Sequence, residues 1–321
     1  MANSDSPENN APNDAFRYRD FLAPKYWPLL LGIALLRLIA LLPMPILSVF
    51  GWTIGSVCYL VLFRRRKIAL KNIQLCFPEL SASQCKLINF KHYCLLGQAI
   101  VTGPINWWAS KARFMRLANI KGREHYDAAL KDNRNIILLA PHFMAMEASG
   151  LALQTERPMI GMYQYMKNPL MNKLALERRQ RFCTGGIMVE RKRSPLRSIL
   201  RALNKGMPMQ YSPDQDAGRK GVFVPFFHQL ASTTPALGKF AQACNAVVIP
   251  VSSTYRPWGM GFDVELGAPI EQFPSGDELA DTTVMNRSME QLIRKHPEQY
   301  LWAHKRFKTR KDGETSFYKG L

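Results

Sequence analysis

The sequence lacks the short motifs that assign a chain to a common enzyme class by inspection. Its 321 residues contain no phosphate-binding G-x-x-x-x-G-K-[ST] loop, no dinucleotide-binding G-x-G-x-x-G after a strand, and no G-x-S-x-G around a serine nucleophile. Because no nucleophile is evident, the sequence favours direct transfer of a group to a bound alcohol over reaction through a covalent intermediate.

Cysteine is scarce, and its spacing points to no metal or cofactor. The six cysteines form no C-x-x-C pair and show no metal-ligand spacing, which predicts reduced thiols in a cytosolic setting. A signal peptide is also missing, since no basic segment runs directly into an apolar core with a small-residue cleavage site. Residues Met1 to Asp14 are polar and rich in Asn, Pro, Ser and Ala, so residues 1–25 are predicted to form a disordered polar N-terminus.

Acidic residues are few. The chain has 24 of them against 43 lysines and arginines, a net charge of +19. Such an excess predicts an anionic partner: a phospholipid surface, nucleic acid, a phosphorylated substrate or an acidic protein. Nucleic acid is the least favoured of these, because the sequence contains no recognition motif for it and carries a long uncharged segment.

That uncharged segment lies near the N-terminus. Tyr26–Leu42 carries a single charge and Ile46–Phe63 carries none. Each run is marginal for the ~20 residues that span a bilayer, but together they predict a membrane anchor over residues 26–67, either one span with an interfacial helix or a hairpin. The basic cluster Arg64–Lys67 then predicts that the catalytic domain, residues 68–321, lies on the cytoplasmic side. The alternative is a buried helical pair in a soluble protein.

Beyond the anchor, a helical region precedes an alternation of strands and helices. The first part predicts helices over Ile68–Leu75, Ser83–Leu96 and Gly97–Trp108. The later alternation is typical of an α/β fold with a mostly parallel central sheet flanked by helices. The predicted strands are Ile136–Leu139, Pro158–Tyr163, Ile187–Val189, Met209–Tyr211, Ala246–Val251 and Gly261–Leu266. The predicted helices are Ala145–Gln154, Pro169–Phe182, Pro195–Leu203 and Thr234–Cys244.

The stretch Asn135–Gly150 carries the most specific chemistry. Its apolar first half predicts a buried strand that Pro141 ends, and its second half predicts a helix. On one regular helix, His142 and Glu147 would be about 140° apart, but they can meet if His142 lies in the loop and Glu147 in the first helical turns. A neutral imidazole then takes a proton from an alcohol while its other N–H donates to the carboxylate. The alternative is a loop histidine and a solvated glutamate.

Other predicted strand ends also carry charge. Arg191 closes the run GGIMVER, and Arg179 lies in the helix that follows NPL. Arginine binds phosphate through paired hydrogen bonds, so both are candidate phosphate ligands, the alternative being a solvated basic face. Asp214 and Asp216 follow the strand Met209–Tyr211. Too few oxygen ligands lie nearby for a metal site, so these aspartates are expected to organise the loop, hold an arginine or contact substrate hydroxyls.

Taken in order, these segments resemble a known family. PHF-x-x-x-E, GGIMVER, SPDQDAG-x-x-GVFVPFF and LWAHKRFKTR follow an N-terminal membrane helix. This order is similar to that of the late acyltransferases of lipid A biosynthesis, the lauroyl/myristoyl transferases of the wider lysophospholipid and glycerol-phosphate acyltransferase superfamily. The likeness runs from about Tyr26 to the end of the chain. Its most specific parts are Asp-x-Asp-x-Gly and the closing W-x-H-x-R-F-K-T-R.

The resemblance implies transfer of a fatty acyl group from acyl carrier protein to a hydroxyacyl chain of a phosphorylated lipid A precursor, at the bacterial inner membrane. His142 would be the general base and Glu147 would orient it. Substrate binding would involve Arg179, Arg191, Asp214 and Asp216. The two aspartates replace a Pro-Glu-Gly block of the glycerol-phosphate relatives, which argues against a glycerol-phosphate acceptor.

Several assignments stay open on the sequence alone. The acceptor could be a lysophospholipid or another glycolipid, and a basic membrane protein could lack chemistry altogether. The acyl chain needs an apolar groove, for which the phenylalanines of GVFVPFF are candidates unless they belong to the core. These are Phe223, Phe226 and Phe227. The resemblance gives Trp302, His304 and Arg306, in the closing motif, a structural or lipid-facing role.

Overall fold

The structure is a computed structural model that describes residues 18–183, 185–190, 196–311 and 313–321. Residues 1–17, on which most of the predicted disordered N-terminus falls, lie outside the described residues, and so does Arg191.

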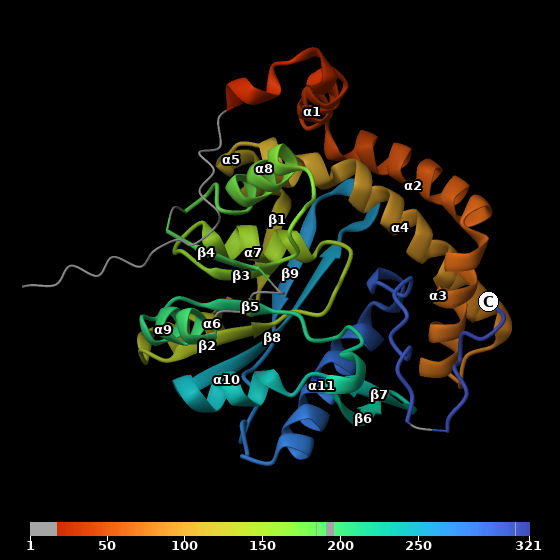
Figure 1. Cartoon of the computed structure of the whole chain (residues 1–321), viewed down its shortest axis with the longest axis vertical. Helices are drawn as coiled ribbons and strands as arrows, with labels where there is room; N and C mark the ends of the chain where they lie inside the picture. Colours follow the sequence, from red (N-terminus) through yellow and green to blue (C-terminus); the bar gives the residue numbers. More distant parts are fainter. Residues whose placement is uncertain (1–17, 184, 191–195, 312) are drawn as a thin grey trace, which may run out of the picture.

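A seven-stranded sheet forms the centre of the molecule (Figure 1). Its strands are β1 (Ala118–Lys121), β2 (Asn135–Leu139), β3 (Ile160–Tyr163), β4 (Ile187–Glu190), β5 (Met209–Tyr211), β8 (Ala246–Tyr255) and β9 (Phe262–Leu266). They lie in the order β1-β9-β8-β2-β5-β3-β4, and every neighbouring pair is parallel except β8 and β9. The predicted α/β fold is therefore confirmed, and each predicted strand is present.

Two strand features were missed. The short edge strand β1 has only four residues, too few for a clear period. The hairpin of β6 (Val222–Phe226) and β7 (Gln229–Thr233) pairs outside the main sheet. Pro225 within β6 weakens the strand signal, because proline cannot donate to a ladder.

Helices cover both faces of the sheet and explain why β2 is apolar throughout. Ile136 and Leu138 point to one core, and Ile137 and Leu139 to the other. The first core is closed by α5 (Lys111–Leu117), α6 (Arg123–Lys131) and α7 (Met146–Gln154). The second is closed by α9 (Leu196–Asn204), α10 (Ala236–Cys244) and α11 (Glu278–Lys295).

The N-terminal helices form a layer along one side of this domain (Figure 1). They are α1 (Trp27–Ile39), α2 (Met44–Val61), α3 (Phe63–Cys76) and α4 (Ala82–Trp108). Two predicted helices merge into α4, which continues through Pro104 and starts at a capping box between Ser81 and Gln84. In the part of the chain that the structure describes, α2 alone is long and apolar enough to cross a membrane.

Glycine allows α2 to lie directly against α4. A Cβ on Gly55 would overlap the backbone of Tyr93 and Cys94, and one on Gly51 would overlap Gln98. Residues further along α2 therefore meet residues earlier on α4, so the two helices run antiparallel. No larger residue fits at these two positions unless the helices move apart.

Candidate active site

His142 and Asp214 meet because they follow neighbouring parallel strands at the same distance. Leu139 at the end of β2 is paired with Tyr211 at the end of β5, and the polar side chain lies three residues beyond the end of each strand. Asp214 Oδ1 lies 2.6 Å from His142 Nδ1, and Oδ2 accepts the backbone N–H of His142 at 2.9 Å. Strand pairing thus positions a carboxylate on an imidazole.

Asp214 is charged even though it is only 1% exposed. Burial by itself would raise the pKa of this carboxyl, but electrostatic attraction to the His142 imidazole and the hydrogen bonds from its ring and its backbone N–H outweigh burial and lower the pKa to about 2. A carboxylate at Nδ1 fixes the proton on that nitrogen, which leaves the lone pair on Nε2. The side-chain nitrogen of Gln215 lies 3.3 Å from Nε2 and can donate to it.

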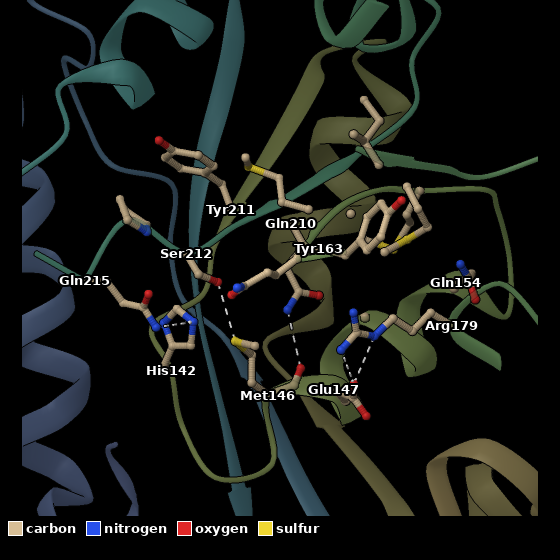
Figure 2. A pocket seen from close by; sticks show the side chains of 18 of the residues that line it. His142, Met146, Glu147, Gln154, Tyr163, Arg179, Gln210, Tyr211, Ser212 and Gln215 are labelled. Carbon is tan, nitrogen blue, oxygen red and sulfur yellow. Dashed lines mark hydrogen bonds and ion pairs between the residues drawn. The ribbon is translucent and has the colours of Figure 1, made fainter. Parts of the chain in front are cut away.

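Glu147 does not take the position on the imidazole that the sequence predicted for it. Its Oε1 accepts two hydrogen bonds from Arg179, at 3.0 Å from Nε and 2.8 Å from Nη2. Arg179 is the last residue of α8 (Pro169–Arg179), and Glu147 lies in the first turn of α7. In Figure 2 the Glu147 side chain points to Arg179, whereas His142 points towards Gln215. Glu147 is excluded from Nδ1 because Asp214, which follows the neighbouring strand β5, already occupies it.

A cavity of about 660 Å³ joins these two groups, since His142, Glu147 and Arg179 all line it. Most of the remaining wall is apolar; it includes Trp107, Leu151, Met159, Met162, Met188 and Phe240. A volume of this size is ordinary for a site that takes a small or elongated ligand. The cavity therefore combines the His142 imidazole, the ion pair of Glu147 and Arg179, and an apolar wall.

Protein groups hold both Asp214 and Asp216, and neither side chain lines the cavity, which favours a role in organising the loop over the predicted contact with substrate. Asp216 accepts hydrogen bonds from the backbone N–H and hydroxyl of Thr309, at 3.0 and 2.9 Å. Its own N–H donates to His304 Nε2 at 3.3 Å. The alternative expectation, that they organise the loop, agrees with these contacts.

The closing motif supports the His142 loop from its other side. Met144 N–H donates to Gln299 O at 2.8 Å, and Leu301 N–H donates to His142 O at 3.0 Å. The neighbouring Tyr300 carbonyl lies 2.9 Å from Nδ1 of His92, a buried histidine on α4 whose burial lowers its pKa to about 4. The segment from Gln299 onward thus links the backbone of the His142 loop to α4.

Three residues of the closing motif are buried: Trp302, Arg306 and Phe307. Trp302 packs with Phe77 and Phe227. Arg306 donates to Ser232 O at 2.7 Å and to the hydroxyl of Thr233 at 2.6 Å. These contacts agree with the structural rather than the lipid-facing expectation.

The phenylalanines of GVFVPFF do not form the wall of the cavity. Phe226 and Phe227 belong to a core cluster with Trp302 and Phe307, and Phe223 lines a separate surface hollow. The alternative expectation, that these phenylalanines belong to the core, is correct for Phe226 and Phe227. Much of the apolar wall comes instead from methionines on or next to β3, β4 and α7, together with Leu151 and Ile160, which gave no local signal in the sequence.

Sequence reasoning also missed the amides of the cavity. Gln154, Gln210 and Gln215 line it, yet no spacing rule singles out a glutamine that only the folded chain brings to a site. Among the described residues, no group of three or more His, Cys, Asp or Glu side chains is arranged to hold a metal ion.

The comparisons with known proteins agree on one family. Residues 16–309 match the family described as "Bacterial lipid A biosynthesis acyltransferase". The chain is 34% identical to a lipid A biosynthesis palmitoleoyltransferase of Escherichia coli K12 over 94% of its length and 97% of the relative's. It is 33% identical to the lauroyltransferase of the same organism, with 92% and 96% covered. The chain belongs to the bacterial lipid A biosynthesis acyltransferases.

A third relative, a lipid A biosynthesis acyltransferase of Haemophilus influenzae, is 35% identical over 92% of this chain and 94% of its own. Among solved structures, a 1-acyl-sn-glycerophosphate acyltransferase from Thermotoga maritima has a TM-score of 0.35 and 17% identity. The matched region covers 77% of this chain and 95% of the Thermotoga maritima chain. This likeness is too distant to add to the family assignment.

Proposed function

We propose that the chain transfers a fatty acyl group from acyl carrier protein to a hydroxyl on an acyl chain of a phosphorylated lipid A precursor, with His142 as the general base. The observation that carries this proposal is the His142 imidazole in an apolar cavity, with Nδ1 held by a buried carboxylate. Family membership supports the class of reaction.

The proton transfers follow from the tautomer that Asp214 fixes. His142 Nε2 takes the proton of the acceptor hydroxyl while that oxygen bonds to the thioester carbonyl carbon. The tetrahedral intermediate then collapses, the C–S bond breaks, and the proton passes from His142 to the leaving thiolate. The products are an ester and a free thiol. A thioester is already activated, so no covalent intermediate on the protein is needed.

Asp214 replaces Glu147 in this mechanism as the group that stabilises the imidazolium. It lies in hydrogen-bond contact with the ring and is buried, so its negative charge acts through little water. Gln215 has to leave Nε2 before the acceptor hydroxyl can approach.

The acceptor phosphate is assigned to the Arg179 side of the cavity. A guanidinium has five N–H groups, and two of those on Arg179 point to Glu147. Glu147 thereby fixes the direction of the guanidinium while its other edge serves an anionic group. Arg191, which lies outside the described residues, remains a predicted second phosphate ligand.

The charge and the apolar helices support the setting of the reaction. A net charge of +19 favours encounter with an acidic carrier protein and with anionic lipid. The apolar N-terminal helices support a position at the inner membrane, and the basic cluster after α2 supports a catalytic domain on the cytoplasmic face, whose lipid leaflet is anionic.

Substitution of the base tests the proposal. His142→Ala is expected to lower kcat by roughly 10²–10⁴, the usual contribution of a positioned base. The matched control is His228→Ala, an exposed histidine in the β6–β7 turn, which should retain activity. The assay follows acyl transfer from the carrier protein to a lipid A precursor by mass spectrometry. Turnover near wild type in His142→Ala would refute the proposal.

The acceptor is tested in cells. Mass spectra of lipid A from cells with and without the gene should differ by the mass of one acyl group, and fragmentation should locate the ester. Unchanged lipid A with altered phospholipid would instead favour a lysophospholipid acceptor.

A further inference from the structure

The loop between β8 and β9 exposes a tryptophan beside the apolar helices. Trp258 is 87% exposed and Met260 is 55% exposed. They lie in and just after the short 3₁₀ turn η4 (Pro257–Gly259). Trp258 also has φ of 58°, a left-handed conformation that is costly for a residue with a bulky side chain. The strained backbone presents a large indole outward instead of burying it.

At Gly259 this loop packs closely against the start of α2. A Cβ at Gly259 would lie 2.7 Å from Pro45 Cα and 2.8 Å from Met44 O, so the loop backbone rests directly on the first turn of the helix. Arg256 N–H donates to Gly261 O at 2.9 Å and closes the turn. The position of Trp258 relative to α2 is therefore set by close backbone packing.

The outer surface of α1, of α2 and of the turn between them is strongly apolar. Side chains more than half exposed include Leu31, Leu38, Leu41, Val49, Phe50 and Leu60. An exposed apolar surface of this extent is typical of a membrane or protein contact. The basic surplus of the chain favours an anionic bilayer as the occupant.

The packing of α2 indicates how the bilayer meets this surface. Since Gly55 of α2 faces Tyr93 of the antiparallel α4, the exposed Lys91 lies level with the second half of α2 along the helix pair. A lysine there is costly inside hydrocarbon. A position with α2 along the bilayer surface, with its outer face in the lipid, avoids that cost.

We propose that the β8–β9 loop is a second membrane contact, in which Trp258 and Met260 enter the interfacial layer of an anionic bilayer beside the first turn of α2. Tryptophan prefers this layer because its ring is apolar and its N–H is polar. Arg256 is close in sequence to Trp258 and Met260, which form the tip of the loop. Its partly exposed guanidinium can contact the anionic headgroups. The inference rests on the proposed function only in that the acceptor is a bilayer lipid.

This contact has a direct connection to the catalytic loop. The side chain of Gln299 accepts from Tyr255 N–H at 2.7 Å and donates to Tyr255 O at 3.0 Å, at the end of β8. The backbone O of the same glutamine accepts from Met144 N–H. Membrane docking of the tip thus fixes the height of the His142 loop relative to the lipid.

The test is sedimentation with vesicles of phosphatidylethanolamine and phosphatidylglycerol. The double variant Trp258→Ser, Met260→Ser should partition about tenfold more weakly, because two large apolar side chains lose their burial in lipid. The matched control is Leu279→Ser, a 55% exposed leucine on the first turn of α11, which should partition like wild type. The single variant Trp258→Tyr should retain most of the wild-type binding to vesicles, since tyrosine also favours the interface.

Activity separates this inference from the proposed function. The double variant should keep wild-type turnover on a detergent-dispersed acceptor and lose it on an acceptor embedded in vesicles. Equal partitioning of the double variant and wild type would overturn the inference. So would a dimer, seen by light scattering without lipid, that dissociates in the double variant, because the tip would then contact a second copy of the chain.

Discussion

Asp214 binds His142 twice, through Oδ1 to the ring Nδ1 at 2.6 Å and through Oδ2 to the backbone N–H at 2.9 Å. The first contact sets the tautomer, and the second fixes the main chain that carries the ring. One buried carboxylate therefore controls both where the imidazole lies and which of its nitrogens is basic.

The first prediction concerns this carboxylate. Asp214→Asn keeps the size of the side chain but removes the charge and lets the ring adopt the other tautomer. We expect kcat to fall by about 10²–10⁴ with little change in acceptor KM. Combined with His142→Ala, it should cost little more than His142→Ala alone, because the two residues act as a unit.

Asp216→Asn is the matched control, since it lies in the same loop but contacts Thr309 and His304. It should lower thermal stability more than kcat. Wild-type kcat in Asp214→Asn would show that the base needs no buried partner.

The second prediction concerns the ion pair in the cavity. Glu147→Gln and Arg179→Ala should each raise KM for the phosphorylated acceptor about tenfold, because both disturb one charge-assisted contact. The double variant should be no worse than either single one. If Glu147→Gln instead lowers kcat as far as His142→Ala does, with KM unchanged, Glu147 serves the base directly.

The third prediction concerns the contact of α2 with α4. Gly55→Val places a side chain against the backbone of Tyr93, and the overpacking should cost about 1–3 kcal/mol. Thermal unfolding in detergent should show a melting temperature lower by roughly 5 °C. Gly103→Val is the control, because a Cβ there meets nothing within 4 Å. Equal shifts in both variants would mean that helix propensity, and not close packing, is being measured.

The fourth prediction is a loss of stability in mild acid. Burial lowers the pKa of His92 from 6.5 to about 4, so below pH 6.5 the unfolded chain binds a proton that the folded chain does not. Stability is complete above pH 6.5 and falls as the pH drops towards 4, by roughly 2 kcal/mol between pH 7 and 5. The carboxyl of Asp214 loses its contribution at lower pH, between 3.8 and about 2.

His92→Gln can still donate to the Tyr300 carbonyl but has no proton to take up. Its unfolding free energy, measured by denaturant titration at pH 7 and pH 5, should change less than that of wild type. A wild-type protein that is equally stable at both values would contradict the assignment.

The fold was predictable because each strand carries its own signal. β2 is apolar at successive positions since helices cover both sides of it, and that pattern is visible without neighbours. The weak elements were missed for the same reason: β1 is short, and β6 contains a proline.

The site was predictable only in part. The loop position of His142 followed from the strand and proline before it. The choice of Asp214 over Glu147 depends on which strand lies beside β2, and β5 follows it only after two intervening strands. Local spacing favoured Glu147, which is close to His142 in the sequence, whereas the order of the strands places Asp214, which is distant in the sequence, against the ring. The cavity wall likewise depends on side chains that are neighbours in space and not in sequence.

The equal distance of His142 and Asp214 from paired strand ends makes loop length a strict requirement. One added residue in either connection lets the chain advance by up to ~3.5 Å, more than the whole separation between the two side chains. Exchanges within β2 or β5 that keep both cores filled leave the geometry alone, whereas an insertion before either residue uncouples the pair. Anyone recombining segments among such enzymes should count these two connections first.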